Sequence, residues 1–189
     1  LVMAKDGSSF IDSFSNVTTP NKVALRALDG TVLTWLEQNE LNKTHPLTAY
    51  HSQLKAPRFG TINAEDGQTM HYRMFEPAAL EPGKKYPVIV SVYGGPHAQR
   101  VTNSWSARDL YLHYLVQQGY LVFQLDNRGS YNRGKAFEDP IYKKLGVAEI
   151  ADQIKGVEYL RSLPYVDAGK IAIYGHSYGG YMAIMAMFK

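Results

Sequence analysis

The chain has 189 residues, of which 45% are apolar and 20% are charged, so it can bury a hydrophobic core and is not a disordered segment. Its 20 basic and 17 acidic residues leave a formal charge of +3, an excess too small to predict binding to nucleic acid or to an anionic membrane. There is no cysteine, which excludes a disulfide framework, a thiolate nucleophile and a zinc ribbon. No apolar run approaches the ~18 residues that a membrane-spanning helix needs.

The first 45 residues have the pattern of antiparallel strands. Residues 8–15 mix apolar and small polar side chains and are predicted to form one strand. Residues 23–28 and 31–36 flank Asp29-Gly30, which is a strong signal for a two-residue hairpin. The stretch 37–57 is polar and contains two prolines, so it is the best candidate for a linker.

A second unit of different character follows this linker, and we place the boundary so that residues 1–45 and 46–189 form separate domains. Asp66-Gly67 predicts another hairpin. Three continuous apolar runs then suit strands of a sheet that is buried on both faces, at residues 88–93, 120–125 and 170–174.

Two helical patterns alternate with these strands. Apolar residues recur at helical spacing over 107–115, where Gly119 supplies a stop, and again over 147–157, before Pro164. Strands that alternate with helices predict βαβ units, a parallel sheet and the α/β class.

The strongest chemical signal is the segment Gly175-His176-Ser177-Tyr178-Gly179-Gly180, which fits the G-x-S-x-G nucleophile elbow. A predicted buried strand precedes it and an apolar, helix-like run over 181–188 follows it, as this motif requires. The glycines leave room for close backbone packing, while the strained turn lifts the serine hydroxyl above the sheet. Ser177 is therefore the candidate nucleophile.

None of the six histidines is a good candidate for its general base. In this fold the histidine follows the serine along the chain, whereas all six here precede Ser177. His176 is adjacent to Ser177, but neighbouring side chains diverge on such a turn, so we expect a packing or hydrogen-bonding role for it. No H-E-x-x-H metal motif occurs either.

A second signal is Tyr93-Gly94-Gly95-Pro96, at the end of the strand that precedes the first helix. In this architecture the loop at that place supplies the second donor of the oxyanion hole. A tyrosine hydroxyl can act as that donor, so Tyr93 is the candidate.

One further motif competes with this interpretation. Residues 129–135 match the phosphate-binding pattern G-x-x-x-x-G-K after a predicted strand. A phosphate loop needs Ser or Thr next, where Ala136 stands, and Pro140 would interrupt the helix that should follow. We therefore expect Arg128 and Arg133 to make structural hydrogen bonds in a loop near the site.

Together these motifs resemble the prolyl oligopeptidase family of serine peptidases, in particular its dipeptidyl peptidase IV branch. The resemblance covers residues 58–189 and rests on four motifs in the family's order: Tyr93-Gly94-Gly95-Pro96, Asp126-Asn127-Arg128-Gly129-Ser130 with Arg133-Gly134, Ala151-Asp152-Gln153-Ile154, and Gly175–Tyr181.

The resemblance implies the N-terminal part of an α/β-hydrolase fold over residues 46–189, cut after the elbow, and the last strands of a β-propeller over 1–45. Ser177 would be the nucleophile, with Tyr178 giving its backbone N–H to the oxyanion and its ring to the S1 wall, and Tyr93 giving its hydroxyl. The family's catalytic Asp and His come later in the chain, so residues 1–189 alone would lack them. The first residue, Leu1, and the apolar end likewise suggest a piece of a longer protein.

The function implied is a serine peptidase that cleaves by acyl transfer and releases N-terminal dipeptides with proline or alanine at the penultimate position. An esterase or acylaminoacyl peptidase on the same fold, and a non-catalytic hydrolase-fold binding protein, stay open as alternatives. No cofactor or metal is implied, and the partner is a peptide substrate rather than nucleic acid. The resemblance allows a homodimeric parent and favours a periplasmic, secreted or surface-anchored one.

Overall fold

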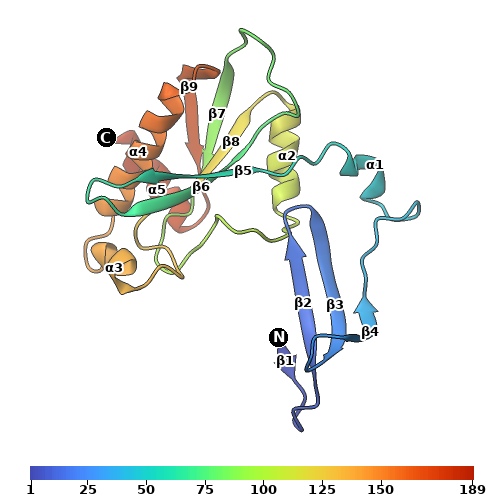
Figure 1. Cartoon of the computed structure of the whole chain (residues 1–189). Coiled ribbons are helices and arrows are strands. Elements are labelled where there is room, and N and C mark those ends of the chain that lie inside the picture. The colour runs from blue at the N-terminus through green and yellow to red at the C-terminus, as the bar shows by residue number, and fades with distance from the viewer. The chain divides into compact units, whose positions relative to one another are not determined.

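The computed structural model describes residues 1–189, which form two compact units. Residues 1–56 and 103–111 make up the first unit, and residues 57–102 and 112–189 make up the second. Both contain β-sheet, and the longer helices lie wholly or largely in the second, so the predicted α/β class is confirmed (Figure 1). None of the helices combines the length and apolar character needed to cross a bilayer.

The first unit is a four-stranded antiparallel sheet in the order β1-β2-β3-β4, with strands Val2–Met3, Ser9–Asn16, Thr19–Ala27 and Val32–Glu37. The hairpin predicted at Asp29-Gly30 forms because Gly30 adopts φ of 89° and the Asp29 carboxylate accepts a hydrogen bond from the Thr31 N–H at 2.9 Å. Two short elements were not predicted: β1 and the one-turn helix α1 (Thr48–His51) in the polar linker.

The second unit is built on a five-stranded sheet in the order β5-β6-β8-β7-β9. The strands are Arg58–Asn63, Thr69–Phe75, Leu121–Asp126, Tyr86–Ser91 and Val166–Tyr174 in that spatial order. β7 runs parallel to both β8 and β9, whereas β5 and β6 pair antiparallel. The sheet is therefore mixed rather than wholly parallel, because the hairpin of β5 and β6 joins its edge through β8.

Helices cover both faces of this sheet. Residues from Leu112 onward in α2 (Asp109–Gln117) pack on one face, where Leu112 and Leu115 contact Phe75 and Val122. On the other face, Leu160 of α4 (Ala148–Ser162) belongs to a cluster with side chains of β6, β7 and β8. Neighbouring residues of one strand thus point to opposite helices, as the period of two requires.

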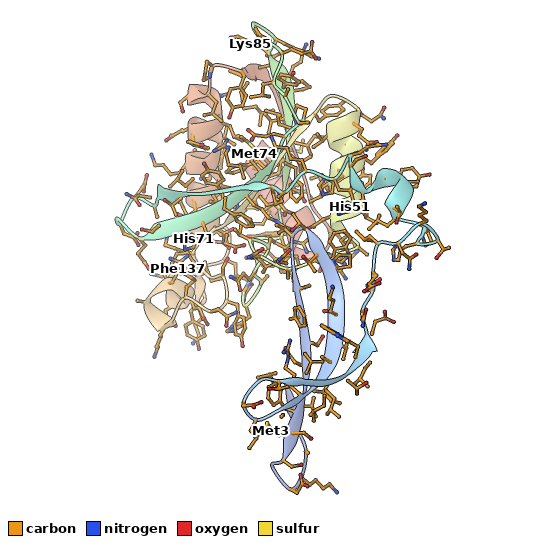
Figure 2. The ribbon with its side chains drawn as sticks, turned by 45° about the vertical axis from the view of Figure 1, so that its right-hand side comes forward. Met3, His51, His71, Met74, Lys85 and Phe137 are labelled. Carbon is orange, nitrogen blue, oxygen red and sulfur yellow. The ribbon has the colours of Figure 1, made fainter.

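The interior of the second unit holds nearly all of the buried apolar side chains. Met74 is fully buried in the sheet, while Lys85 lies in the loop that leads into β7 (Figure 2). The remaining helical elements are α3 (Lys135–Glu138), a 3-10 turn (Asp139–Ile141) and α5 (Tyr178–Met187).

The parallel strands place the candidate site residues together. The C-terminal ends of β7, β8 and β9 lie at the same edge of the sheet, because β7 is parallel to both neighbours. The segments that follow these ends carry Tyr93, Asn127 and Ser177. In open α/β sheets, ligands bind outside the carboxyl ends of parallel strands.

Candidate active site

Ser177 occupies the turn between β9 and α5 in a strained conformation. Its φ of 57° and ψ of −121° lie outside the regions that non-glycine residues favour. The side chain is exposed, as a nucleophile requires. Residues in such conformations are frequent at active sites, and they persist only where the surrounding structure holds them in place.

The two glycines of the elbow make this turn possible. A Cβ on Gly175 would come within 2.5 Å of the Val92 carbonyl oxygen and of the Gly179 carbonyl carbon. A Cβ on Gly179 would collide with the same Val92 oxygen. The entry and exit of the turn therefore pack directly on the backbone that follows β7, and any side chain at these two positions would push the segments apart.

Tyr178 is the first residue of α5, so its backbone N–H has no acceptor within the helix. Its hydroxyl donates a hydrogen bond to Oε1 of Glu149 at 2.6 Å. Burial, together with this bond and the charge of Glu149, raises the pKa of the Tyr178 hydroxyl well above its ordinary value. The phenol consequently stays a hydrogen-bond donor throughout the neutral range.

Tyr93 lies in the loop after β7 rather than within a strand, since β7 ends at Ser91. Its ring lies beside that of Tyr178, with 6.1 Å between the ring centroids. Gly95 permits this approach, because a Cβ there would come within 2.8 Å of the Tyr178 ring and within 2.9 Å of the Tyr93 ring. The structure thus brings both residues predicted for the oxyanion hole together next to Ser177.

The segment after β8 anchors the Tyr93 loop. The Asn127 side chain donates to the Gly94 carbonyl at 3.0 Å, and the Gly129 carbonyl accepts from the His97 N–H at 3.1 Å. The Asp126 carboxylate accepts from the backbone N–H groups of residues 100 and 101, at 2.7 and 3.1 Å. Burial raises the pKa of Asp126 even though these two bonds favour its charged form. The Asp126-Asn127-Arg128-Gly129 motif is therefore the support on which this loop rests.

Arg128 belongs to the same support. Its guanidinium donates to both carboxylate oxygens of the fully buried Asp152, with the shortest contact at 2.7 Å, and to Asp66 at 2.7 Å. Arg133 donates to the Thr69 carbonyl at 2.7 Å. The structural hydrogen bonds predicted for the two arginines are confirmed. The helix after this loop, α3, has only four residues, which does not suit a phosphate loop.

His176 has an exposed side chain, and its expected packing or hydrogen-bonding role stays a prediction. His97 lies 3.3 Å from a carboxylate oxygen of Glu138, on the loop after Tyr93. All six histidines precede Ser177 in the chain, so the argument from chain order against a histidine base among them still holds.

Three polar residues lie beneath the site, and their role there was not predicted: Asn127 and Gln153 belong to motifs of the resemblance, whereas Glu149 was not singled out from the sequence. Glu149 is fully buried and contacts Tyr178, while the buried Asn127 and Gln153 are joined by a hydrogen bond of 2.9 Å. Two of them, Glu149 and Gln153, lie on α4 within its apolar pattern. Polar residues at helix positions that face a core are the signal that would have identified them, because such groups are buried only with hydrogen-bond partners.

Comparison with known proteins agrees with this geometry. Residues 105–189 match the model of the prolyl oligopeptidase family. Human dipeptidyl peptidase 8 is 36% identical to the chain over 190 residues, which cover 95% of this chain and 20% of that protein. The mouse dipeptidyl peptidase 8 is 34% identical over 193 residues and is covered to a similar extent, 21%.

Two solved structures are similar as well. A protein of Bacteroides ovatus assigned as a dipeptidyl aminopeptidase IV superposes with a TM-score of 0.87 and 43% identity, covering 98% of this chain and 26% of that one. Dipeptidyl peptidase 4 of Porphyromonas gingivalis gives a TM-score of 0.83 and 32% identity, covering 97% and 26%. The chain therefore spans about a quarter or less of the length of these relatives. The match of residues 105–189 to the prolyl oligopeptidase family, together with these relatives, confirms the resemblance that the motifs predicted.

Proposed function

We propose that the protein to which this chain belongs is a serine peptidase that works by acyl transfer, with Ser177 as nucleophile. The observation that carries the proposal is the strained φ of Ser177, enforced by two glycines that pack on the Val92 carbonyl. The turn follows β9 at the carboxyl ends of the parallel strands β7, β8 and β9, and we propose Tyr93 and Tyr178 as the oxyanion donors there. The strained turn is costly to maintain and has no evident structural purpose.

In the proposed reaction the Ser177 hydroxyl attacks the scissile carbonyl carbon while a general base takes its proton. The oxygen of the tetrahedral intermediate accepts hydrogen bonds from the Tyr178 N–H and the Tyr93 hydroxyl. Collapse expels the amine, which receives a proton, and leaves an acyl-enzyme that water hydrolyses by the same steps. No histidine follows Ser177 in residues 1–189, so we assign the base and its orienting carboxylate to residues outside this stretch.

For the substrate we propose peptides from which N-terminal dipeptides are released, with proline or alanine in the second position. The names of the relatives support dipeptide release. The Tyr178 ring stands next to Ser177, where it can form one wall of the pocket for the residue that carries the scissile carbonyl. A proline or alanine side chain is short and apolar enough to lie against such a ring.

For the domain organisation we propose the N-terminal part of an α/β-hydrolase domain over residues 46–189 and the end of a β-propeller over residues 1–45. The four-stranded antiparallel sheet of β1 to β4 supports the second assignment, because propeller blades are sheets of four antiparallel strands. The β-strand order and the elbow between β9 and α5 support the first.

A fluorophosphonate probe on the full-length natural protein tests the proposal. It should label Ser177, and Ser177→Ala should abolish both labelling and turnover. Ser162→Ala is a matched control, because the Ser162 hydroxyl donates to the Tyr159 carbonyl at the end of α4 and has no proposed catalytic role. Labelling that persists after Ser177→Ala would overturn the assignment. Release rates from Ala-Pro, acetyl-Ala and simple ester chromogenic substrates separate a dipeptidyl peptidase from an acylaminoacyl peptidase or an esterase.

A further inference from the structure

Glu149 is a fully buried acidic residue in the first turn of α4, a position that needs an explanation. Three donors converge on its carboxyl group. The backbone N–H groups of Gly146 and Val147 lie at 2.6 and 3.2 Å, and the Tyr178 hydroxyl lies at 2.6 Å. A carboxylate accepts several hydrogen bonds and donates none, so this set of donors suits it. Two of the bonds are local to α4, whereas the third reaches the residue after the nucleophile.

The Tyr178 ring is held from several sides, and only Glu149 holds its polar end. The Tyr181 ring meets it edge-on, with 5.1 Å between centroids. The Gly95 backbone lies against the flank of the Tyr178 ring, because a Cβ added to Gly95 would come within 2.8 Å of that ring. A ring on two torsions that is fixed at its hydroxyl and on its flanks also fixes the Cα to which it is attached. The backbone N–H of Tyr178 belongs to that same residue.

The geometry points to Glu149 as a positioning residue: its carboxylate holds the Tyr178 hydroxyl and thereby keeps the Tyr178 N–H aimed at the oxyanion. The inference rests on the proposed function, which gives that N–H its role. It matters because the preceding residue, Ser177, is strained, so the backbone would relax if nothing held the ring. Burial and the bond to Glu149 keep the phenol protonated, so the donor is available at every pH near neutrality.

A purely structural role for Glu149 predicts a different result. In that case the carboxylate would only close the turn at Gly146 and Val147, and its removal would act equally with or without the Tyr178 hydroxyl. The positioning role requires the two groups to act as a unit, which a double-mutant cycle measures.

The cycle uses the full-length natural protein with Glu149→Leu, Tyr178→Phe and the double variant, and it measures kcat, KM and the thermal midpoint on an Ala-Pro chromogenic substrate. Loss of a whole oxyanion donor costs on the order of 10²–10³ in kcat, so a displaced donor should cost about tenfold. We expect Glu149→Leu to lower kcat by about that factor with KM changed less than about threefold. Glu149→Gln keeps one acceptor oxygen for the phenol and should recover most of the loss. In the Tyr178→Phe background, Glu149→Leu should lower kcat little further.

Glu76→Gln is the matched control. Glu76 is also a mostly buried carboxylate that accepts a tyrosine hydroxyl, that of Tyr165 at 3.1 Å. Glu76 directly follows Phe75, the last residue of β6. Phe75 pairs with Val122 near the start of β8, whereas the site lies beyond the end of β8, so Glu76 is at the opposite end of the sheet from the site. This variant should lower the thermal midpoint and leave kcat unchanged.

Each other outcome overturns the inference. An equal fold-loss for Glu149→Leu in both backgrounds would show a structural role, and an unchanged kcat would show no role. If Glu149→Leu does not fold, Glu149→Asp, whose carboxyl group is retracted by one methylene, is used in the same cycle with the same criteria. If turnover by the wild type is the same as that of Ser177→Ala, the proposed function itself fails and the inference fails with it. The comparison of these two proteins separates that result from a failure of the inference alone.

Discussion

Gly179 packs so closely on the carbonyl oxygen of Val92 that no Cβ fits between them. This contact joins the first turn of α5 to the segment after β7, and so joins the nucleophile elbow to the loop of Tyr93. Gly180, the next residue, is different: a Cβ there would lie 3.6 Å from the Gly175 carbonyl oxygen, an ordinary contact.

The two neighbouring glycines therefore predict opposite effects of the same substitution. Gly179→Ala should destabilise the protein by about 1–3 kcal/mol, because a buried backbone contact must open. Gly180→Ala should be neutral or stabilising by up to about 1 kcal/mol, because alanine is favoured over glycine in a helix. Thermal unfolding and turnover of the two variants check this, and equal effects would mean that the elbow does not depend on the Val92 contact.

Asn127 should be intolerant of a change that alters only its hydrogen-bonding character. Its fully buried amide donates to the carbonyls of Gly94 and Arg128, at 3.0 and 2.7 Å. Asn127→Asp turns both donors into acceptors and buries a charge against two carbonyl oxygens, so we expect a loss of about 3 kcal/mol or more in stability.

The control for Asn127 is Asn132→Asp. The Asn132 amide is exposed and donates to Gln99 at 3.0 Å, so this variant should stay within about 0.5 kcal/mol of wild type. Both are compared by thermal unfolding at neutral pH. Similar losses of stability in the two variants would show that the Asn127 amide does not hold the loop at Gly94 in place.

Tyr93→Phe tests the proposed side-chain donor while keeping the aromatic contact with Tyr178. Because an oxyanion donor acts mainly in the transition state, kcat should fall on the order of 10²–10³ while KM changes little. Steady-state kinetics on a dipeptide substrate measure both constants. A kcat within about threefold of wild type would mean that another group supplies this donor.

The tyrosines around Arg58 should make stability fall at high pH. Burial raises the pKa of Tyr72 and of Tyr165 to about 12, from an ordinary value of 10.0. The folded state therefore keeps protons that the unfolded state has released. This contribution to stability is complete below pH 10 and is lost as the pH rises from about 10 to 12.

Tyr165→Phe should reduce the slope of that loss. A difference of one bound proton between the folded and unfolded states changes the free energy of unfolding by up to ~1.4 kcal/mol per pH unit. The variant removes one titrating group from that difference in bound protons. Unfolding by denaturant at several alkaline pH values, together with the phenolate absorbance, measures it. Identical slopes for variant and wild type would contradict the raised pKa of Tyr165.

The main strands and the elbow could be predicted because their signals are local. Asp29-Gly30 and Asp66-Gly67 fix hairpins through their own backbone preferences, and the glycines around Ser177 fix the turn. The support of the site could not be found in this way. Glu149 and Asn127 act through partners 29 and 33 positions away, Tyr178 and Gly94, and only the tertiary fold brings them within hydrogen-bond distance. The edge hairpin was predicted from its turn, but its antiparallel pairing with β8 depends on the order of strands in the sheet.

Residues 1–189 expressed alone should show no Ser177-dependent turnover. An unassisted serine hydroxyl is a weak nucleophile, and in this fold the histidine that activates it follows it in the chain. All six histidines of this stretch precede Ser177, and the nearest in sequence, His176, has an exposed side chain. In residues 1–189, β9 is also the edge strand of its sheet, and Tyr174 of β9, Ile184 of α5 and Phe188 after α5 are exposed. An open apolar edge of this kind favours aggregation, so poor solubility is expected as well. The measurement is an assay of this segment with an Ala-Pro chromogenic substrate beside its Ser177→Ala variant, and turnover that depends on Ser177 would show that a base exists within these residues.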